Sequence, residues 1–227
     1  LLERHGIDLL HAPGYLMPLR PGRPTVITVY DIIALLFPRL CKQTNVLNFR
    51  LFLPLSIHRA SAVIVPSDAT RNDILARWPG VEHKLHTIPL AASRLFCRCR
   101  DPERRAAVRR KYGLPDRFIL FLGQQEPKKN IKGLLEAFAA LRTNSDLEVK
   151  LVIAGGRGWG CAETDRTRRQ LGLEPYTVYP GFIDEEDLPV LYSLADVFAF
   201  PSFYEGFGLP PLEAMACGTP VLTSDRG

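Results

Sequence analysis

The stretch FILFLGQQEPKKNIKGLLEAFA, residues 118–139, predicts the fold because it reads as a strand, a loop and a helix in succession. Residues 118–122 are all apolar, as in a strand that is covered on both faces of its sheet. The residues that follow place apolar side chains at the spacing of one helix face: Ile131, Leu134, Leu135, Phe138 and Ala139. A buried strand that leads into an amphipathic helix is the repeating unit of parallel α/β sheets.

Further apolar runs have the same character as this strand. They are residues 26–30, 62–65, 149–153, 197–200 and 221–222, which are rich in Val, Ile and Phe. Helical segments lie between them, and one begins at the acidic run Asp184–Asp187, whose charges would offset the positive end of a helix dipole. Strands that alternate with helices predict an α/β protein built of doubly wound, Rossmann-like parallel sheets.

A basic segment interrupts this alternation. Between Arg94 and Lys111 the chain has eight Lys and Arg residues against two acidic ones, whereas the net charge of the whole chain is +5. We therefore expect two lobes, residues 1–95 and 116–227, joined by a basic connection at 96–115 that contains a helix at about Pro102–Lys111. Nucleic-acid surfaces interleave aromatic residues with basic ones. Only Phe96 and Tyr112 flank this run, so a solvated linker is favoured and no nucleic-acid partner is expected.

The composition is that of a soluble globular protein, with 46% hydrophobic and 23% charged residues over 227 positions. No apolar run approaches the roughly 18–20 residues that span a bilayer, and no signal peptide is expected from the first residues of the sequence. Five scattered cysteines, an odd number, favour a reducing compartment and therefore the cytoplasm. The one close pair, Cys97 and Cys99, lacks the second pair of ligands that a zinc site needs, and no metal is expected.

Both ends of the chain are expected to be cut. There is no initiator Met, and Gly227 follows the last predicted strand almost at once. A doubly wound unit has about six strands, and neither predicted lobe reaches that number. We expect a piece of a longer protein in which both lobes are incomplete.

The segment from Pro201 to Gly218 carries the richest chemistry, at the carboxyl end of the predicted strand 197–200, where open α/β sheets bind ligands. Its glycines allow tight turns, and Pro210 and Pro211 suit the first turn of a helix that Gly218 would end. Glu205 would then lie on the loop and Glu213 in the first helical turn, both facing the crevice.

Two such carboxylates can accept hydrogen bonds from vicinal hydroxyl groups of a sugar and a ribose. The backbone N–H groups between Glu205 and Glu213 could meet a phosphate. The alternative is that Glu213 only favours the helix dipole and Glu205 is a solvated loop residue.

Two more glycine loops follow predicted strands. One runs from Gly123 to Asn130 and ends in Lys129 at a helix start, which is a natural diphosphate site. The other, residues 154–160 with the sequence AGGRGWG, indicates by itself only a tight turn.

These motifs resemble the signature of glycosyltransferase family 4, the group 1 glycosyltransferases, which are retaining enzymes of the two-lobed GT-B fold. The family pattern is Glu, seven residues, Glu, and Glu205 and Glu213 match it. The resemblance implies that Glu205 contacts the donor sugar and Glu213 the ribose. It also implies that the backbone of Gly206, Phe207 and Gly208 approaches the sugar and the diphosphate.

The loop after residue 122 resembles the family's element of glycine, five residues and Lys-Asn/Gly. This resemblance places Gly123 in the donor site and Lys129 on the donor phosphates, so Glu205 and Lys129 are the expected catalytic residues. Two positions depart from the family pattern. Gln124 stands where the family often has Arg, and Tyr30 stands where many relatives have a His near the reacting sugar.

The resemblance implies a hexosyltransferase that moves a sugar from a nucleoside diphosphate donor to a hydroxyl of a glycan or lipid-linked acceptor. Mannose is the family-level candidate sugar, bacterial polysaccharide biosynthesis the setting, and neither metal nor other cofactor is implied. Two alternatives remain open, a sugar-nucleotide epimerase of the same fold and a non-catalytic binder of sugar nucleotides. The fragment by itself is expected to be inactive.

The apolar-rich segment 45–59 is expected to be a buried or lobe-packing helix, because Pro54 would interrupt a helix that lies on a membrane. The alternative is a peripheral membrane contact at the inner face of the membrane.

Overall fold

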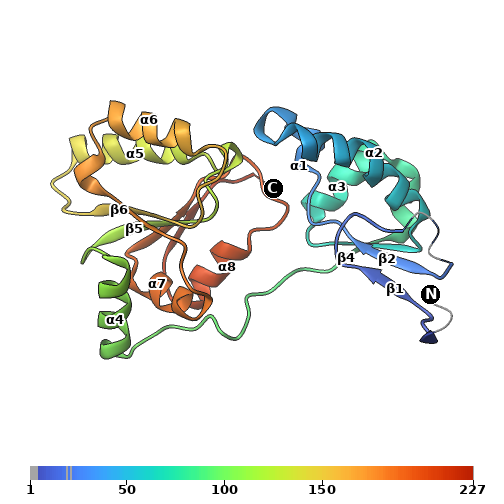
Figure 1. The fold of residues 1–227 in the computed structure, drawn as a ribbon, viewed down its shortest axis with the longest axis horizontal. Helices are drawn as coiled ribbons and strands as arrows, with labels where there is room; N and C mark the ends of the chain where they lie inside the picture. Colours follow the sequence, from blue (N-terminus) through green and yellow to red (C-terminus); the bar gives the residue numbers. More distant parts are fainter. Residues whose placement is uncertain (1–4, 19, 21, 227) are drawn as a thin grey trace. The chain divides into compact units, whose positions relative to one another are not determined.

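The computed structural model describes residues 5–18, 20 and 22–226, which form two units (Figure 1). By their contacts, the first unit comprises the chain up to Leu90 together with Glu205–Phe207, and the second comprises Ala91–Tyr204 and Gly208–Arg226. Each unit has its own parallel sheet and its own hydrophobic core.

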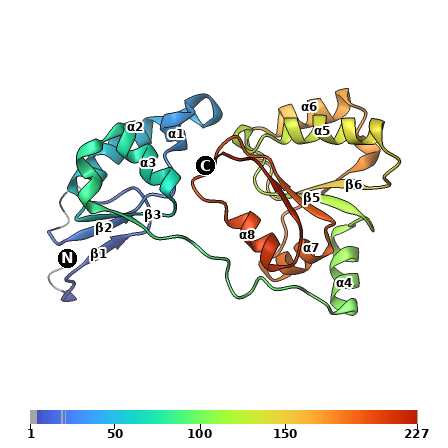
Figure 2. The ribbon, with the colours of Figure 1, turned by 180° about the vertical axis from the view of Figure 1, so that it is seen from behind.

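The first unit is built on a sheet of four parallel strands in the order β1-β2-β3-β4. These are β1 (Leu10–Ala12), β2 (Thr25–Thr28), β3 (Ala62–Val65) and β4 (Leu85–Thr87). The helices are α1 (Ile33–Leu36), α2 (Gln43–Arg59) and α3 (Asp68–Arg77), with 3-10 turns at Pro38–Leu40 and Pro79–Lys84. The helices α2 and α3 lie on the same side of this sheet in both views (Figures 1 and 2).

Helix α2 runs through Pro54 without a break, so the prediction that Pro54 would interrupt a helix here is wrong. A proline in a helix loses one backbone hydrogen bond, and here Leu53 and Ile57 beside it are both 0% exposed and hold the helix on the core. The opposite face is apolar as well. Leu47, Leu51 and Leu55 recur every fourth residue and are 56%, 53% and 42% exposed.

The second unit is built on five parallel strands in the order β7-β6-β5-β8-β9. They are β5 (Phe118–Leu122), β6 (Lys150–Ala154), β7 (Thr177–Gly181), β8 (Val197–Phe200) and β9 (Val221–Thr223). The helices are α4 (Pro102–Tyr112), α5 (Ile131–Asn144), α6 (Cys161–Gln170), α7 (Leu188–Leu194) and α8 (Leu209–Ala216). Short 3-10 turns lie at Pro127–Lys129, Glu174–Tyr176 and Glu185–Asp187.

The sheet of the second unit is covered on both faces, as its apolar strands predict. Phe118 and Leu120 pack with residues of α4, α7 and α8, whereas Phe121 packs with residues of α5. Figures 1 and 2 show α5 and α6 together on one side of this sheet and α7 and α8 on the other. The chain therefore forms the predicted α/β fold with two parallel sheets, the second of which is covered by helices on both faces. Among the described residues, no helix is both long enough and apolar enough to span a bilayer.

Most predicted elements are confirmed, including the helices at Pro102 and Ile131. The strands β1, β4 and β7 are not among the predicted runs. The first two have three residues each with a central histidine, His11 or His86, and the third ends in Pro180 and Gly181. Polar or strand-breaking residues remove the apolar pattern by which a short strand is predicted from sequence. The pairing of such strands depends on neighbours that are distant in the sequence.

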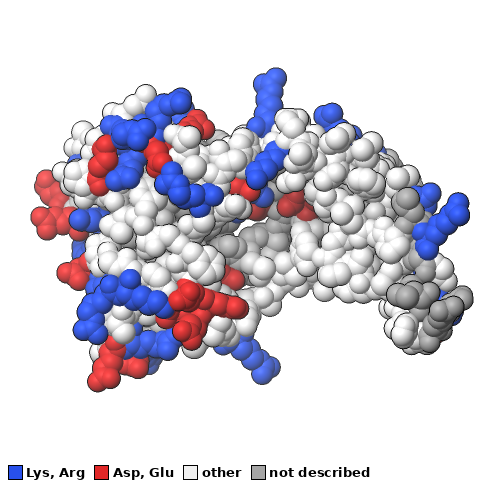
Figure 3. Space-filling model, viewed as in Figure 1, with Lys and Arg blue, Asp and Glu red and all other residues white. Residues whose placement is uncertain are grey.

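The acidic run lies at the start of α7, as predicted, and Asp187 makes further contacts that the sequence did not predict. Glu185–Asp187 form a 3-10 turn, and Asp187, at the N-cap of α7, is only 5% exposed. Lys111 Nζ lies 2.7 Å from one Asp187 carboxylate oxygen, and the Tyr112 hydroxyl donates to the same oxygen at 2.9 Å. Figure 3 shows basic and acidic side chains side by side around α4. Asp187 therefore ties α4 to α7 through ion pairs rather than by capping a helix.

We expect Asp187→Ala to lower the free energy of unfolding by about 1–3 kcal/mol, because the Tyr112 hydroxyl and the Lys111 ammonium lose their buried acceptor. Urea denaturation followed by circular dichroism measures the change. Glu185→Ala, which removes an exposed carboxylate of the same turn, is the control and should stay within about 0.5 kcal/mol of the wild type. Equal midpoints for the two variants would contradict a structural role of Asp187.

Candidate functional site

The order of the second sheet creates a topological switch point between β5 and β8. These two strands are neighbours, yet the chain continues from β5 to α5 on one face and from β8 to α8 on the other. Open α/β sheets bind ligands at such a switch point, outside the carboxyl ends of the strands. The loops Gly123–Asn130 and Pro201–Gly208 begin there, and the Phe203 N–H donates to the Lys128 carbonyl at 2.9 Å.

The loop after β5 brings a cation to this edge of the sheet. Lys129 ends the 3-10 turn Pro127–Lys129, and its Nζ lies 4.5 Å from the centre of the Phe200 ring at the end of β8. Asn130 follows and caps α5, since its side-chain oxygen accepts from the Gly133 N–H at 3.2 Å. The loop thus places Lys129 next to the N-terminus of a 14-residue helix.

The glycine loop after β6 supports the loop after β5. The Gly123 N–H donates to the Ala154 carbonyl at 3.0 Å, and the Gly160 N–H donates to the Gln125 carbonyl at 3.0 Å. Gly155 has a φ of +113°, and a Cβ there would overlap the carbonyl oxygen of Gly123. The two backbones approach so closely that this position requires glycine.

The segment after β8 has most of the predicted features. Gly208 has a φ of +113° and precedes α8, which carries Pro210 and Pro211 in its first turn, and Gly218 follows the helix with a φ of +78°. Glu205–Phe207 form the middle of the loop between β8 and α8 and group by contacts with the first unit.

The prediction that Glu213 lies in the first turn of α8 is wrong, because Glu213 is the fifth residue of the helix. It is half-buried, and its Oε2 accepts a hydrogen bond from the Tyr192 hydroxyl at 2.9 Å. Burial raises the pKa of the Glu213 carboxyl, and the hydrogen bond from Tyr192 acts in the opposite direction. A carboxylate so far inside the helix adds little to the dipole interaction, which favours a binding role over the alternative.

The second unit therefore brings four of the predicted site residues to the β5/β8 edge of its sheet. Gly123 and Lys129 lie in the loop after β5, and Gly208 and Glu213 lie in the loop and helix after β8. Sequence reasoning missed Tyr192, whose hydroxyl meets Glu213.

Two buried polar side chains were missed as well. Gln125 and Ser202 are 2% and 1% exposed, and in the described part of the chain Gln125 Oε1 and Ser202 Oγ have no hydrogen-bond partner. Their place after β5 and β8 was the available signal.

The two departures from the expected pattern are exposed. Gln124 lies in the loop after β5, and Tyr30, which is 48% exposed, follows β2 in the first unit. In the same unit His11 Nε2 lies 3.0 Å from Thr28 Oγ1. The described residues include no cluster of three His, Cys, Asp or Glu side chains arranged to hold a metal ion.

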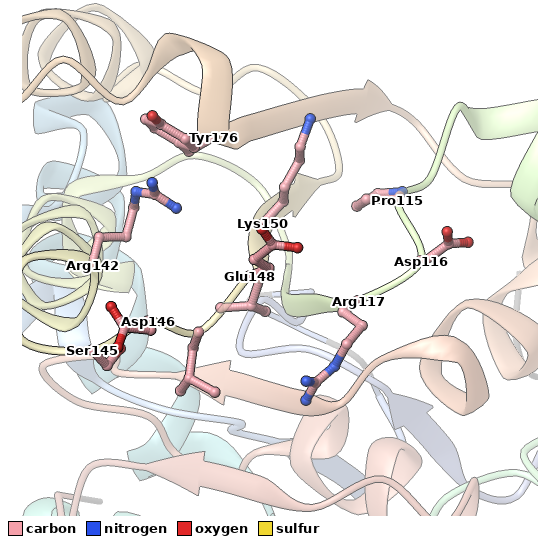
Figure 4. A pocket seen from close by; sticks show the side chains of 11 residues that line it. Pro115, Asp116, Arg117, Arg142, Ser145, Asp146, Glu148, Lys150 and Tyr176 are labelled. Atoms are coloured by element: carbon pink, nitrogen blue, oxygen red, sulfur yellow. The ribbon is translucent and has the colours of Figure 1, made fainter.

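A pocket of about 930 Å³ lies at the opposite, amino-terminal edge of the second sheet (Figure 4). There Arg142 stacks on the Tyr176 ring, with its guanidinium carbon 3.2 Å from the ring centre. The pocket is lined by Pro115, Asp116, Arg117, Arg142, Ser145, Asp146, Leu147, Glu148, Val149, Lys150 and Tyr176. Three basic and three acidic side chains offset one another, so this pocket lacks the cationic character that a diphosphate needs.

Comparison with known proteins gives matches over nearly the whole chain. The family described as "Glycosyl transferases group 1" matches residues 104–227, and the one described as "Glycosyltransferase Family 4" matches residues 1–92. The O-antigen chain mannosyltransferase B of Escherichia coli is 34% identical over 218 residues, which are 96% of this chain and 57% of that protein.

Solved structures agree in fold. Anabaena Alr3699/HepE in complex with UDP and glucose superposes with a TM-score of 0.79 at 26% identity, over 99% of this chain and 61% of that one. Sucrose-phosphate synthase from Thermosynechococcus elongatus superposes with a TM-score of 0.77 at 28% identity, over 100% of this chain and 58% of that one. The chain thus spans about three fifths of the length of these relatives.

We expect Gly155→Ala to destabilise the protein by about 1–3 kcal/mol, because alanine at a positive φ is strained and its Cβ would displace the Gly123 backbone. Gly156→Ala is the matched control, since its Cβ would meet nothing within 4 Å. Thermal unfolding of both variants measures the difference, and equal melting temperatures would show that the loops do not pack as described.

Proposed function

The chain belongs to the group 1 glycosyl transferases, and from this premise we propose that the protein transfers a sugar from a nucleoside diphosphate donor to an acceptor hydroxyl, with retention at the anomeric carbon. The observation that carries the proposal is the switch point between β5 and β8. Two elements with the chemistry for a sugar nucleotide begin there, the loop of Lys129 and the helix of Glu213.

The diphosphate would be held by positive charge without a metal. Lys129 supplies a full charge, and the N-terminus of α5 next to it supplies the positive end of a helix dipole. The loop at Gly123 and the backbone amides of Gly206, Phe207 and Gly208 would allow close approach to the phosphates and the sugar. This set of contacts suits an anion that gains charge as it leaves.

The two carboxylates would hold the hydroxyl-rich ends of the donor. We assign Glu213 to the ribose, because its carboxylate is held at half-buried depth by Tyr192. Glu205, which seven residues separate from Glu213, is assigned to the donor sugar. Charge-assisted hydrogen bonds of this kind are about twice as strong as neutral ones.

In the proposed reaction the acceptor oxygen forms a bond to the anomeric carbon on the face from which the phosphate departs. The bond between that carbon and the phosphate oxygen breaks, and the leaving phosphate takes the proton of the acceptor hydroxyl. Lys129 stabilises the negative charge on the phosphate, and Glu205 holds the sugar in place for the attack.

Mannose is the proposed sugar, and glycan or glycolipid biosynthesis the proposed setting. The mannosyltransferase named above supports the sugar, whereas the solved relative with bound UDP and glucose keeps the nucleotide open between GDP and UDP. We propose residues 1–95 as part of an acceptor lobe and 116–227 as part of the donor lobe, with 96–115 between them.

A non-catalytic binder of sugar nucleotides is the second candidate. It is favoured by Gln124, an uncharged residue in the loop that would hold the donor phosphates, and by Tyr30 after β2. Binding without turnover by the full-length protein would support it, and turnover to another sugar nucleotide without any acceptor would instead indicate an epimerase.

The exposed face of α2 supports a contact with the inner surface of the membrane, where a lipid-linked acceptor would lie. Leu47, Leu51 and Leu55 form its apolar row, and the helical period places Arg50 beside this row and Arg59 at its end, one turn beyond Leu55. Apolar side chains between basic ones are typical of helices that lie on anionic lipid.

We expect Lys129→Ala to lower kcat/KM for sugar transfer by the full-length enzyme roughly 10- to 100-fold, because a charged contact to the leaving phosphate is lost. Glu205→Ala should also impair transfer. Lys132→Ala, an exposed lysine of the same helix start, is the control and should leave transfer unchanged. Full activity in both Lys129→Ala and Glu205→Ala would show that the site is assigned wrongly.

We expect the double variant Leu51→Ser and Leu55→Ser to bind anionic vesicles at least about 10-fold more weakly than the wild type, because two leucines no longer enter the lipid interface. Co-sedimentation with phosphatidylglycerol vesicles measures binding. Leu147→Ser, which changes a 50% exposed leucine of the second unit, is the control. Unaltered binding of the double variant would exclude this face of α2.

A further inference from the structure

Tyr192 links the buried core of the second unit to the carboxylate of Glu213. It lies on α7, is 0% exposed, and donates its hydroxyl hydrogen to Glu213 Oε2 at 2.9 Å. A buried tyrosine hydroxyl needs a partner, and a backbone carbonyl would satisfy it equally well. Here the partner is a side chain that the proposed function places on the donor.

The Tyr192 side chain is held in a fixed position. Its ring makes edge contacts with Phe198 of β8 at 5.3 Å and with Phe96 at 6.0 Å between ring centres. Its carbonyl accepts from the Thr219 hydroxyl, which lies just beyond α8, at 2.6 Å. The hydroxyl is therefore a donor whose position is set by the core on several sides.

We propose that Tyr192 is a positioning residue of the donor site, whose hydroxyl fixes the Glu213 carboxylate in the orientation that the ribose hydroxyls need. The proposal rests on the assignment of Glu213 to the ribose. A single hydrogen bond occupies Oε2 and leaves Oε1 as the acceptor offered to the ligand. Without it, the Glu213 side chain would rotate among several rotamers, and ordering it would weaken donor binding.

The electrostatics act in the same direction. Burial raises the pKa of the Glu213 carboxyl, and the Tyr192 hydrogen bond lowers it, which favours the ionised form that accepts from ribose. The pKa of Tyr192 is itself raised by burial and by the Glu213 charge, so the hydroxyl keeps its proton. Loss of the hydroxyl therefore raises the Glu213 pKa, and protonation weakens ribose binding at a higher pH than in the wild type.

The test is Tyr192→Phe in the full-length protein, since phenylalanine keeps the buried ring and removes only the donor. The probes are GDP and UDP, each compared by titration calorimetry with its 2′,3′-dideoxy form. We expect the wild type to bind one of the two ribonucleotides, and to bind it at least about 10-fold more tightly than its dideoxy form. In Tyr192→Phe this preference should shrink at least about threefold, the dideoxy affinity should stay within about twofold, and the acid limb of the affinity should move to higher pH.

Tyr112→Phe is the matched control. It also removes a tyrosine hydroxyl that donates to a buried carboxylate, that of Asp187, but outside the donor site. Both variants should lose stability, and only Tyr192→Phe should lose the preference for ribose. An unchanged preference and pH limb in Tyr192→Phe would overturn the proposal and leave the hydroxyl a purely structural group.

Glu213→Gln separates this proposal from the function on which it rests. If Glu213→Gln abolishes the preference for ribose and Tyr192→Phe keeps it, only the role of Tyr192 fails. If Glu213→Gln keeps the preference, or if the wild type binds neither nucleotide, the assignment of Glu213 fails and the role of Tyr192 with it. The combined variant should be no worse than Glu213→Gln alone, because the two residues act through one carboxylate.

Discussion

The pairing of β8 with β5 is the constraint on which the candidate site depends. Asp196, just before β8, fixes this pairing through two hydrogen bonds to the backbone of Phe118, one from its own backbone and one to its side chain. Its N–H donates to the Phe118 carbonyl at 3.0 Å, and its carboxylate accepts from the Phe118 N–H at 2.8 Å. A slip of one residue would turn Phe198 and Phe200 from one core to the other. Because two aromatic side chains would then be misplaced, the register is strongly specified, and with it the point at which the two site loops leave the sheet.

The sequence predicted the parts of the second unit whose signals are local. The apolar strand from Phe118 and the helix from Ile131 each show their own period, and Gly208 and Gly218 mark the ends of α8. The sequence did not predict in which turn of α8 Glu213 lies. The helix begins at Leu209, so that Pro210 and Pro211 fill its first turn and Glu213 falls beyond it. Helix boundaries are commonly uncertain by one or two residues, and here that shift decides which neighbour the carboxylate meets.

Contacts between elements far apart in the sequence lay beyond prediction for a physical reason. Tyr192 occupies a position of the helix period that marks it only as buried, and its hydroxyl finds Glu213 because α7 and α8 pack on the same face of the sheet. Asp187 reads as a residue of an acidic helix start, but α4 brings Lys111 and Tyr112 to it from 75 residues or more away. Period and composition report burial, whereas the identity of a partner depends on how the elements pack.

The same packing brings the charge of Lys129 to the β5/β8 edge and limits the movement of its side chain. Lys129 lies over the ring of Phe200, which is 2% exposed at the carboxyl end of β8, so a residue of the core holds the stem and ammonium of a flexible side chain. Cation–π contacts are worth about 0.5–2 kcal/mol, enough to bias a lysine toward one place but weak enough for the ammonium to turn to a phosphate. Phe198 lies two residues earlier on the same face and holds Tyr192. One face of β8 therefore orients both the cation proposed for the diphosphate and, through Tyr192, the carboxylate proposed for the ribose.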